Sequence, residues 1–238
     1  MLVLDVGNSA IKYATFKETR RVDGGRLPVG SCLDSLPAAR VAAAVSVNDA
    51  ELERLRMRLP HLRVVGEDIP LQVPVRYCPP EDLGCDRVMS VVGALHRCPE
   101  AQGVLVVDLG TCMTFTLGLR EEGILGGAIL PGPELQSRAL AQWTAGLPLV
   151  EPARPEPGAQ PPAALGCSTA ESIRSGLWHG TVGAARELIA RLSAESPVRP
   201  RVVAVGGGAG LLSAALPEVE AVHVFATLWG VYRTAGAG

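Results

Sequence analysis

Two short stretches of the sequence place an aspartate directly after an apolar run, with a glycine two residues later. The first is LVLDVGNSAIKYATF at residues 2–16, and the second is VLVVDLGTCMTFTLG at residues 104–118. In the first copy, Gly7 lets a ligand approach the backbone closely. The N–H groups of the turn could receive a phosphate, while Asp5 holds a hydrated Mg²⁺ and Lys12 supplies positive charge. Taken alone, this stretch is also compatible with a plain β-hairpin.

The second copy strengthens the phosphate hypothesis, because one such turn in each half is typical of a two-lobed protein that clamps a polyphosphate. Here Asp108 would bind an ion, and Thr111 would donate its hydroxyl to a phosphate. A third stretch, AVGGGAG at residues 204–210, follows an apolar run with consecutive glycines that could pack against adenine or ribose. A purely structural turn also explains that stretch, so the prediction rests on the three together.

A fourth stretch, LGCDR at residues 83–87, supplies a chemistry for such a clamp. Asp86 could act as a general base that accepts the proton of a substrate hydroxyl attacking the γ-phosphate. Arg87 would then steady a substrate carboxylate or the charged transition state. The alternative is that Asp86 caps a helix and Arg87 makes a surface ion pair. Spacing alone leaves both interpretations open.

Segments with strand and helix patterns alternate in both halves, which predicts an α/β architecture. Strands are expected at 2–4, 9–16, 41–47, 62–66, 103–110, 114–119, 201–205 and 221–225, with a loop and short strand over 22–36. Helices are expected at 49–59 (N-cap Asp49), 86–97, 134–142, 168–195 (interrupted near Gly176 or Gly180), 211–216 and 226–235. Residues 151–162 read as a proline-rich surface loop. The repeat, about 103 residues apart, predicts two related lobes, 1–102 and 103–238, with a ligand cleft between them.

Composition excludes several classes of function. The chain has 238 residues, 47% of them hydrophobic, so it can bury a large core. Its net charge of −2 provides no overall field that would attract nucleic acid or a membrane surface. Its six cysteines form no C-x-x-C pair, no basic leader precedes the first strand, and no apolar run is long enough to cross a bilayer. We therefore expect a soluble cytoplasmic protein.

Seven motifs in fixed order resemble those of the type III pantothenate kinases, a family that includes the Bvg accessory factor proteins. The resemblance runs from residue 2 to about residue 232. The motifs are DVGNSAIK (5–12), Tyr77 with LGCDR (83–87), DLGTCMT (108–114), GGAILPG (126–132), TAGLP (144–148), GCSTAESIRSG (166–176) and GGGA (206–209).

The resemblance implies two ribonuclease H-like lobes of the actin-like ATPase fold, in a protein that is usually a homodimer. It also implies ATP-dependent phosphorylation of pantothenate, the first step toward coenzyme A, with Mg²⁺ and a monovalent cation such as K⁺ or NH₄⁺. Asp86 matches the catalytic base, Asp108 matches the ligand of the monovalent cation, and Asp5 would hold Mg²⁺, through water if not directly. The positions that match ATP contacts are Asp5, Val6, Gly7, Asn8, Ser9, Ala10, Ile11, Lys12 and Thr111. Those that match substrate contacts are Tyr77, Gly84, Cys85, Asp86, Arg87 and Thr169.

Three positions depart from the family pattern. Cys112 replaces a usual alanine, Val75 replaces an asparagine near the substrate, and Gly208 replaces an aspartate near the nucleotide. The departures at Val75 and Gly208, with the kinship to the accessory factors, keep open a second hypothesis, a non-catalytic accessory or regulatory protein that retains the fold. A third hypothesis is another kinase or phosphatase of the superfamily that acts on a sugar or polyphosphate. The aromatic content of only 4% argues against a sugar site, since such sites often stack sugars on aromatic rings.

Overall fold

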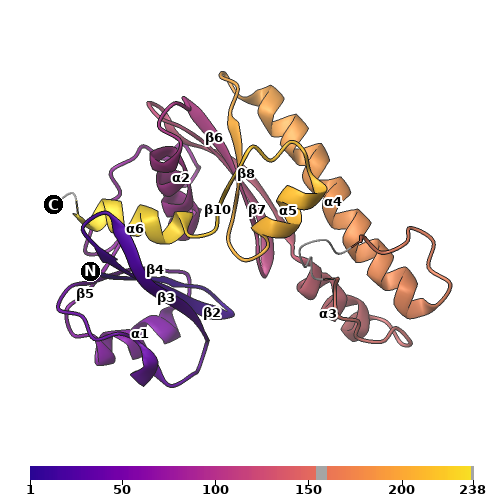
Figure 1. The fold of residues 1–238 in the computed structure, drawn as a ribbon, viewed down its shortest axis with the longest axis horizontal. Coiled ribbons are helices and arrows are strands. Elements are labelled where there is room, and N and C mark those ends of the chain that lie inside the picture. Colours follow the sequence, from indigo (N-terminus) through magenta and orange to yellow (C-terminus); the bar gives the residue numbers. More distant parts are fainter. Residues whose placement is uncertain (154–159, 237–238) are drawn as a thin grey trace. The chain divides into compact units, whose positions relative to one another are not determined.

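The computed structural model describes residues 1–153 and 160–236, and strands alternate with helices along both halves (Figure 1). Of the proline-rich loop predicted at 151–162, residues 154–159 lie outside the described part. Among the described residues, the strands form two five-stranded sheets, which confirms the predicted α/β class.

The first sheet has the strand order β3-β2-β1-β4-β5. Its strands are β1 (Leu2–Val6), β2 (Ala10–Lys17), β3 (Arg20–Pro28), β4 (Ala42–Ser46) and β5 (Leu62–Val64). β1 pairs antiparallel with β2 and parallel with β4, so it lies in the middle of the sheet. That position explains why every residue of β1 is buried. β3 is longer than the short strand expected within 22–36, because its nine residues continue the pairing of β2.

The second sheet repeats this topology with the order β8-β7-β6-β9-β10. Its strands are β6 (Gly103–Leu109), β7 (Cys112–Leu119), β8 (Gly123–Pro131), β9 (Arg201–Val205) and β10 (Ala221–His223). β6 pairs parallel with β9, as β1 does with β4. The two copies of the sequence motif thus begin two sheets of the same strand order.

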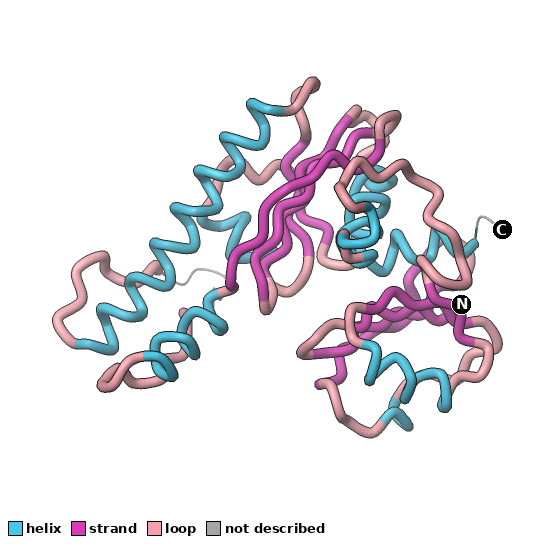
Figure 2. Tube along the Cα trace, turned by 180° about the vertical axis from the view of Figure 1, so that it is seen from behind, coloured by secondary structure: helices cyan, strands magenta, loops and turns pink. Residues whose placement is uncertain are grey.

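The helices follow the expected order, and Figure 2 shows them against the strands. They are α1 (Asp49–Arg58), α2 (Cys85–Arg97), α3 (Pro133–Trp143), α4 (Thr169–Glu195), α5 (Ala209–Ala215) and α6 (Ala226–Gly236), with short 3₁₀ turns η1 (Leu33–Ser35) and η2 (Pro80–Asp82). α4 is continuous, so the interruption expected at Gly176 or Gly180 is wrong. The N-cap of α1 is Asn48 rather than Asp49, because the Asn48 side chain accepts the N–H of Glu51.

The chain forms two compact units. Unit 1 contains Met1–Ala101, Gly118–Gly126 and the segment that begins at Phe225, and unit 2 contains Gln102–Leu117 and Gly127–Val224. The boundaries of compact units and of functional lobes can fall at different residues. The functional lobes 1–102 and 103–238 therefore stay a prediction.

In unit 1, α6 packs tightly against α2, and glycines make this approach possible. A methyl group at Gly93 would overlap the carbonyl of Ala226, and one at Gly230 would overlap the carbonyl of Met89. Beside this contact, the rings of Phe16 and Tyr232 stack with centroids 4.6 Å apart. A core of Leu, Val, Ile and Ala side chains fills the space between α1 and the first sheet. The end of β1 that carries Asp5 is therefore held on a rigid scaffold.

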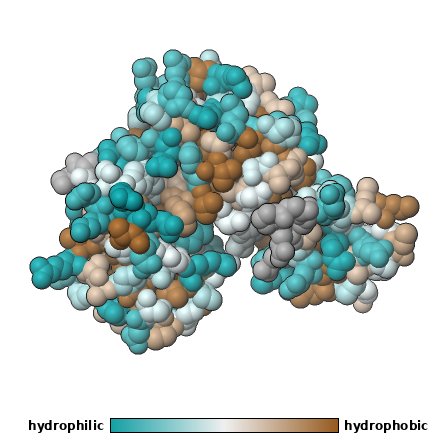
Figure 3. Space-filling view, viewed as in Figure 1, coloured by the Kyte–Doolittle hydropathy of each residue, from teal (hydrophilic) through white to brown (hydrophobic). Residues whose placement is uncertain are grey.

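In unit 2, α3 and α4 are joined by a small apolar cluster of Val150, Ile173 and Leu177. Large apolar side chains of this unit are nevertheless exposed: Trp143, the last residue of α3, is 81% exposed, and Leu165, which precedes α4, is also 81% exposed. Figure 3 shows apolar residues interspersed with polar ones on the face that it draws. Within the described ranges, no helix combines the length and the apolar character that crossing a bilayer requires.

Candidate functional site

The Asp5 carboxylate forms an ion pair on the first hairpin. The antiparallel register of β1 and β2 places Asp5 opposite Lys12, and Lys12 Nζ lies 3.2 Å from Asp5 Oδ2. Asp5 is only 6% exposed, whereas the Lys12 side chain is 38% exposed. The pair therefore combines a fixed, buried carboxylate with an ammonium group that solvent and ligands can reach.

The turn between these strands leaves its tip accessible. The N–H of Gly7 donates to the carbonyl of Ala10 over 3.0 Å, and Asn8 and Ser9 between them are exposed. A methyl group at Gly7 would meet the carbonyl of Ala10 at 3.4 Å, which is close but without severe overlap. Packing within the described chain therefore gives little reason for a glycine at this position.

Asp86 is the second residue of α2, and the N-cap of this helix is Gly84. The capping alternative for Asp86 is therefore wrong as stated. Asp86 Oδ1 instead accepts the N–H of Arg87 over 2.8 Å. Burial and the negative charge of Asp5 raise the pKa of Asp86, while the backbone bond and the charges of Arg87 and Lys12 oppose this shift. A carboxylate with a raised pKa is suited to take up a proton.

Arg87 is buried, with only 7% of its surface exposed, so the interpretation as a surface ion pair is also wrong. Its guanidinium carbon lies 5.9 Å from the centroid of the Tyr77 ring. This distance is at the outer limit of a cation–π contact. Arg87 and Tyr77, which both match substrate contacts of the family, therefore face one another.

The backbone around Cys85 is closely fitted. A methyl group at Gly84 would lie 2.6 Å from Asp86 Oδ1, so this glycine leaves room for the carboxylate. Gly66 follows β5 with a φ of 93°, and a methyl group there would lie 2.8 Å from Cys85 Sγ. Burial, followed by the charges of Asp86 and Glu67, raises the pKa of the Cys85 thiol. Sequence reasoning missed Gly66, although a lone glycine after a short strand is a turn signal.

The segment before Tyr77 is held by β8, a contact that sequence reasoning also missed. The N–H of Arg76 donates to the carbonyl of Ile124 over 2.8 Å, and the N–H of Ile124 donates to the carbonyl of Pro74 over 2.9 Å. Val75 forms a bridge with Ile124. Both ends of this contact belong to unit 1. The backbone around Val75, where the family usually has an asparagine, is thus fixed by main-chain bonds that do not depend on the side chain at this position.

In unit 2, the structure brings Asp108 against the glycine turn that follows β9. Asp108 pairs in register with Val205, and a methyl group at the next residue, Gly206, would overlap the Asp108 carboxylate. Gly206 has a φ of 73°, which glycine adopts without strain. The N–H of Gly208 donates to the carbonyl of Leu109 over 3.1 Å. The second motif and the third therefore form one local structure.

Two further predicted residues of unit 2 lie at exposed positions. Thr111 is exposed in the turn after β6, and its carbonyl accepts the N–H of Gly132 over 2.9 Å. Thr169 is the exposed first residue of α4. The helix is capped by Ser168, whose hydroxyl accepts the N–H of Glu171, so Thr169 is not the cap.

The predicted site residues thus fall into two groups. Unit 1 holds the turn from Asp5 to Lys12, Tyr77 and the segment Gly84–Arg87. Unit 2 holds Asp108, Thr111 and Thr169.

Two sheets of one topology, each starting with a hairpin that carries an aspartate, define the actin-like ATPase fold. Solved structures with this fold match nearly the whole chain. A Baf family protein from Campylobacter jejuni has a TM-score of 0.65 at 16% identity and covers 100% of this chain and 98% of its own. Component A of (R)-2-hydroxyglutaryl-CoA dehydratase from Acidaminococcus fermentans has a TM-score of 0.53 at 16% identity, covering 99% and 98%. These similarities establish the fold alone.

Sequence comparison identifies the family within this fold. The family model described as type III pantothenate kinase matches residues 1–191. A type III pantothenate kinase from Geobacter sulfurreducens is 31% identical over 97% of this chain and 96% of its own length. One from Myxococcus xanthus is also 31% identical, with the same coverage. The chain belongs to the type III pantothenate kinase family.

Proposed function

We propose that this protein transfers the γ-phosphoryl group of ATP to the primary hydroxyl of pantothenate, forming 4'-phosphopantothenate and ADP. Family membership supports this reaction. The observation that carries the proposal is the environment of Asp86, a partly buried carboxylate whose pKa is raised by burial and by Asp5. Such a group can accept a proton near neutral pH more readily than an exposed aspartate.

In the proposed reaction, the hydroxyl oxygen of pantothenate attacks the γ-phosphorus while the bond to the β,γ-bridging oxygen breaks. The hydroxyl proton moves to Asp86, and the bridging oxygen leaves as part of ADP. Lys12 supplies positive charge close to Asp5, where the phosphates would bind. Arg87, buried beside Tyr77, would hold the pantothenate carboxylate.

The family motifs suggest further residues that would bind ATP and pantothenate. The turn from Asp5 to Lys12, including Val6, Asn8, Ser9, Ala10 and Ile11, would receive the ATP phosphates through its backbone, and Thr111 would add a hydroxyl. Gly84, Cys85, Tyr77 and Thr169 would contact pantothenate. The exposure of Asn8, Ser9, Thr111 and Thr169 is compatible with these contacts.

The donor atoms present fit the two proposed ions. Mg²⁺ prefers oxygen ligands, keeps several waters and often uses only one or two carboxylates, which suits the single buried carboxylate of Asp5. Mg²⁺ would neutralise phosphate charge when bound. Asp108 fits a monovalent cation such as K⁺ or NH₄⁺, because the absent side chain at Gly206 leaves its carboxylate beside a backbone turn. In the described ranges, no group of three or more His, Cys, Asp or Glu side chains could hold a metal ion.

We also propose that the protein acts in the cytoplasm, where ATP is available, as a homodimer. The exposed side chains of Trp143 and Leu165 support self-association, because large exposed apolar groups are common at protein interfaces. Neither nucleic acid nor a membrane is part of the proposal.

Replacing Asp86 with Asn tests the proposed reaction. We expect pantothenate-dependent ADP formation, measured with Mg²⁺ and K⁺, to fall about 10²–10⁴-fold, because a general base contributes this much. The matched control is Asp82→Asn, at an exposed aspartate four residues earlier, which should keep wild-type activity. Circular dichroism checks that both variants are folded.

Unchanged turnover in Asp86→Asn would refute the assignment of the base. A folded wild type that binds ATP but phosphorylates no pantothenate would support the alternative of an accessory or regulatory protein. Replacing pantothenate with glucose or polyphosphate in the same assay tests the remaining alternative, another kinase or phosphatase of the superfamily. Turnover with one of these compounds but not with pantothenate would support it.

A further inference from the structure

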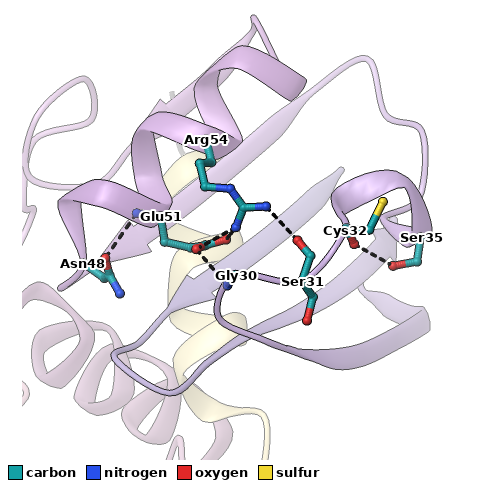
Figure 4. A network of polar contacts seen from close by, with 7 residues as sticks. All are labelled: Gly30, Ser31, Cys32, Ser35, Asn48, Glu51 and Arg54. Atoms are coloured by element: carbon teal, nitrogen blue, oxygen red, sulfur yellow. Dashed lines mark hydrogen bonds and ion pairs between the residues drawn. The ribbon is translucent and has the colours of Figure 1, made fainter.

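A buried carboxylate outside the proposed site, Glu51, makes an unusually complete set of bonds (Figure 4). Glu51 lies in the first turn of α1 and is only 3% exposed. Its two carboxylate oxygens lie 2.7 and 2.9 Å from Arg54 Nη1. Its Oε2 also accepts the N–H of Gly30 over 3.1 Å, and Arg54 Nη2 donates to the carbonyl of Ser31 over 2.8 Å. The pair therefore binds two successive residues of the loop after β3.

That loop is also bonded to the turn that carries the candidate phosphate-binding groups. The N–H of Val29, one residue before Gly30, donates to the carbonyl of Ser9 over 3.2 Å. Gly30 has a φ of 81°, so the loop changes direction directly after this bond. A shift of the loop relative to α1 would therefore also move the carbonyl of Ser9.

The other side of the turn leads to the same helix. The N–H of Val47 donates to the carbonyl of Val6 over 3.0 Å. The next residue, Asn48, caps α1 by accepting the N–H of Glu51 over 3.1 Å. The first turn of α1 is thus connected to the Gly7–Ala10 turn at two points, through Val6 directly before it and through Ser9 within it.

The cost of this arrangement indicates that stability alone does not explain it. Burying the Glu51 carboxylate costs hydration energy that the ion pair only offsets, because the Arg54 side chain is 38% exposed and water screens its charge. Glu51 does not cap its own helix, since Asn48 already does so. Its carboxylate and its arginine are instead directed at backbone groups of the loop. This is the pattern of side chains that fix the position of a second segment.

We propose that Glu51 and Arg54 are positioning residues that hold the Gly7–Ala10 turn in the conformation that receives the phosphates of a nucleoside triphosphate. The inference rests on the proposed function, because it takes this turn as the phosphate-binding segment. The pair touches neither nucleotide nor pantothenate and acts through Val29 and Ser9. It should therefore affect nucleotide binding more than binding of the second substrate.

The test compares Arg54→Met with Arg56→Met, an arginine of the same helix whose partners Glu53 and Glu67 are on the surface. We expect Arg54→Met to raise KM for ATP about tenfold while KM for pantothenate stays within about twofold, because only the turn is displaced. Arg54→Lys keeps the charge but lacks the fork that reaches Glu51 and Ser31 together, so it should recover the ATP KM only in part. Arg56→Met should leave both constants unchanged.

A second measurement separates this proposal from general destabilisation. The double variant Glu51→Gln/Arg54→Met leaves no buried carboxylate without its arginine, so its melting temperature should recover toward wild type while its ATP KM stays raised. Recovery of both quantities, or an equal rise in both KM values in Arg54→Met, would overturn the positioning role.

Amide hydrogen exchange, measured in the absence of nucleotide, tests the positioning role independently of the proposed function. In Arg54→Met, amides at residues 7–10 and 29–31 should exchange faster than in wild type, while those of β1 stay protected. Unchanged exchange would overturn the proposal whatever the kinetics show. A wild type that binds no ATP in a titration would overturn the proposed function, and the nucleotide part of this inference with it.

Discussion

The two hairpins that carry Asp5 and Asp108 share their topology but differ in what surrounds the carboxylate. Asp5 faces Lys12 across the hairpin, and the neighbouring parallel strand leads through Asn48 into a capped helix. In the second copy, the position that corresponds to Lys12 is Phe115, which is fully buried, and the neighbouring strand is followed directly by Gly206. The same element thus carries a partly exposed lysine beside its aspartate in one half and a backbone turn without side chains in the other.

The two roles proposed for this motif would follow from that difference. A carboxylate beside an ammonium group suits anionic ligands that bring their own Mg²⁺, because the lysine offsets part of the phosphate charge. A carboxylate beside a glycine turn suits a cation, because carboxylate and backbone carbonyl oxygens could both bind it. Substitutions at equivalent positions of the two hairpins can therefore break or sharpen the comparison.

Asparagine at each aspartate should give the largest contrast. We expect Asp5→Asn to lower kcat/KM about 10²–10³-fold, because the phosphates and Mg²⁺ lose a fixed charge. Asp108→Asn should retain more activity and raise the K⁺ concentration for half-maximal activation about tenfold. Titrations of Mg²⁺ and K⁺ in the ADP assay measure both effects. Equal loss of Mg²⁺ dependence in the two variants would show that the hairpins have the same role.

The presence of two related halves, each beginning with a strand hairpin, could be predicted from the sequence repeat. Each copy contains an apolar run, a turn and a second strand, and later apolar runs supply the parallel neighbours β4 and β9. The candidate residues Asp5, Lys12 and Asp86 were also predictable, since their chemical types and order are local features. Motif resemblance then assigned roles that spacing alone had left open.

The supporting contacts could not be predicted in the same way. Arg54 reaches Ser31 across 23 positions of the chain, and β8 holds the backbone before Tyr77 through Ile124. Such contacts depend on where loops end in space, and neither composition nor periodicity reports this. Gly93 and Gly230 similarly read as ordinary helical residues until α2 and α6 are seen to pack through them.

Alanine at Gly206 tests the second hairpin with a smaller expected effect. The residue has a φ of 73° and its methyl group would overlap the Asp108 carboxylate, so we expect destabilisation by about 1–3 kcal/mol. K⁺ activation should weaken in the same variant. The matched control is Gly207→Ala, where no heavy atom lies within 4 Å of the added methyl group. Denaturant unfolding measures the stability, and equal effects of the two substitutions would contradict a tight fit at Gly206.

The smallest effect concerns stability at Asp86, which belongs to the first half only. Burial and Asp5 raise the pKa of Asp86 in the folded protein, so the protonated form favours the folded state. That contribution is complete below the pKa of the unfolded chain, about 4, and is lost as pH rises through the higher folded value. At pH 7 the ionised carboxylate therefore opposes folding, and Asp86→Asn should unfold at the same temperature as wild type or slightly above it. The advantage should disappear near pH 4.

The activity of the wild type should depend on pH in the opposite sense, because only the ionised carboxylate can accept the hydroxyl proton. We expect kcat/KM to fall as pH is lowered through the raised pKa of Asp86, at a higher pH than an ordinary aspartate would produce. Melting curves and rates measured over the same pH series test both expectations. A lower melting temperature for Asp86→Asn at pH 7 would mean that this carboxylate supports the fold. A carboxylate that is kept for chemistry at some cost to folding should give a variant that is less active but no less stable than wild type.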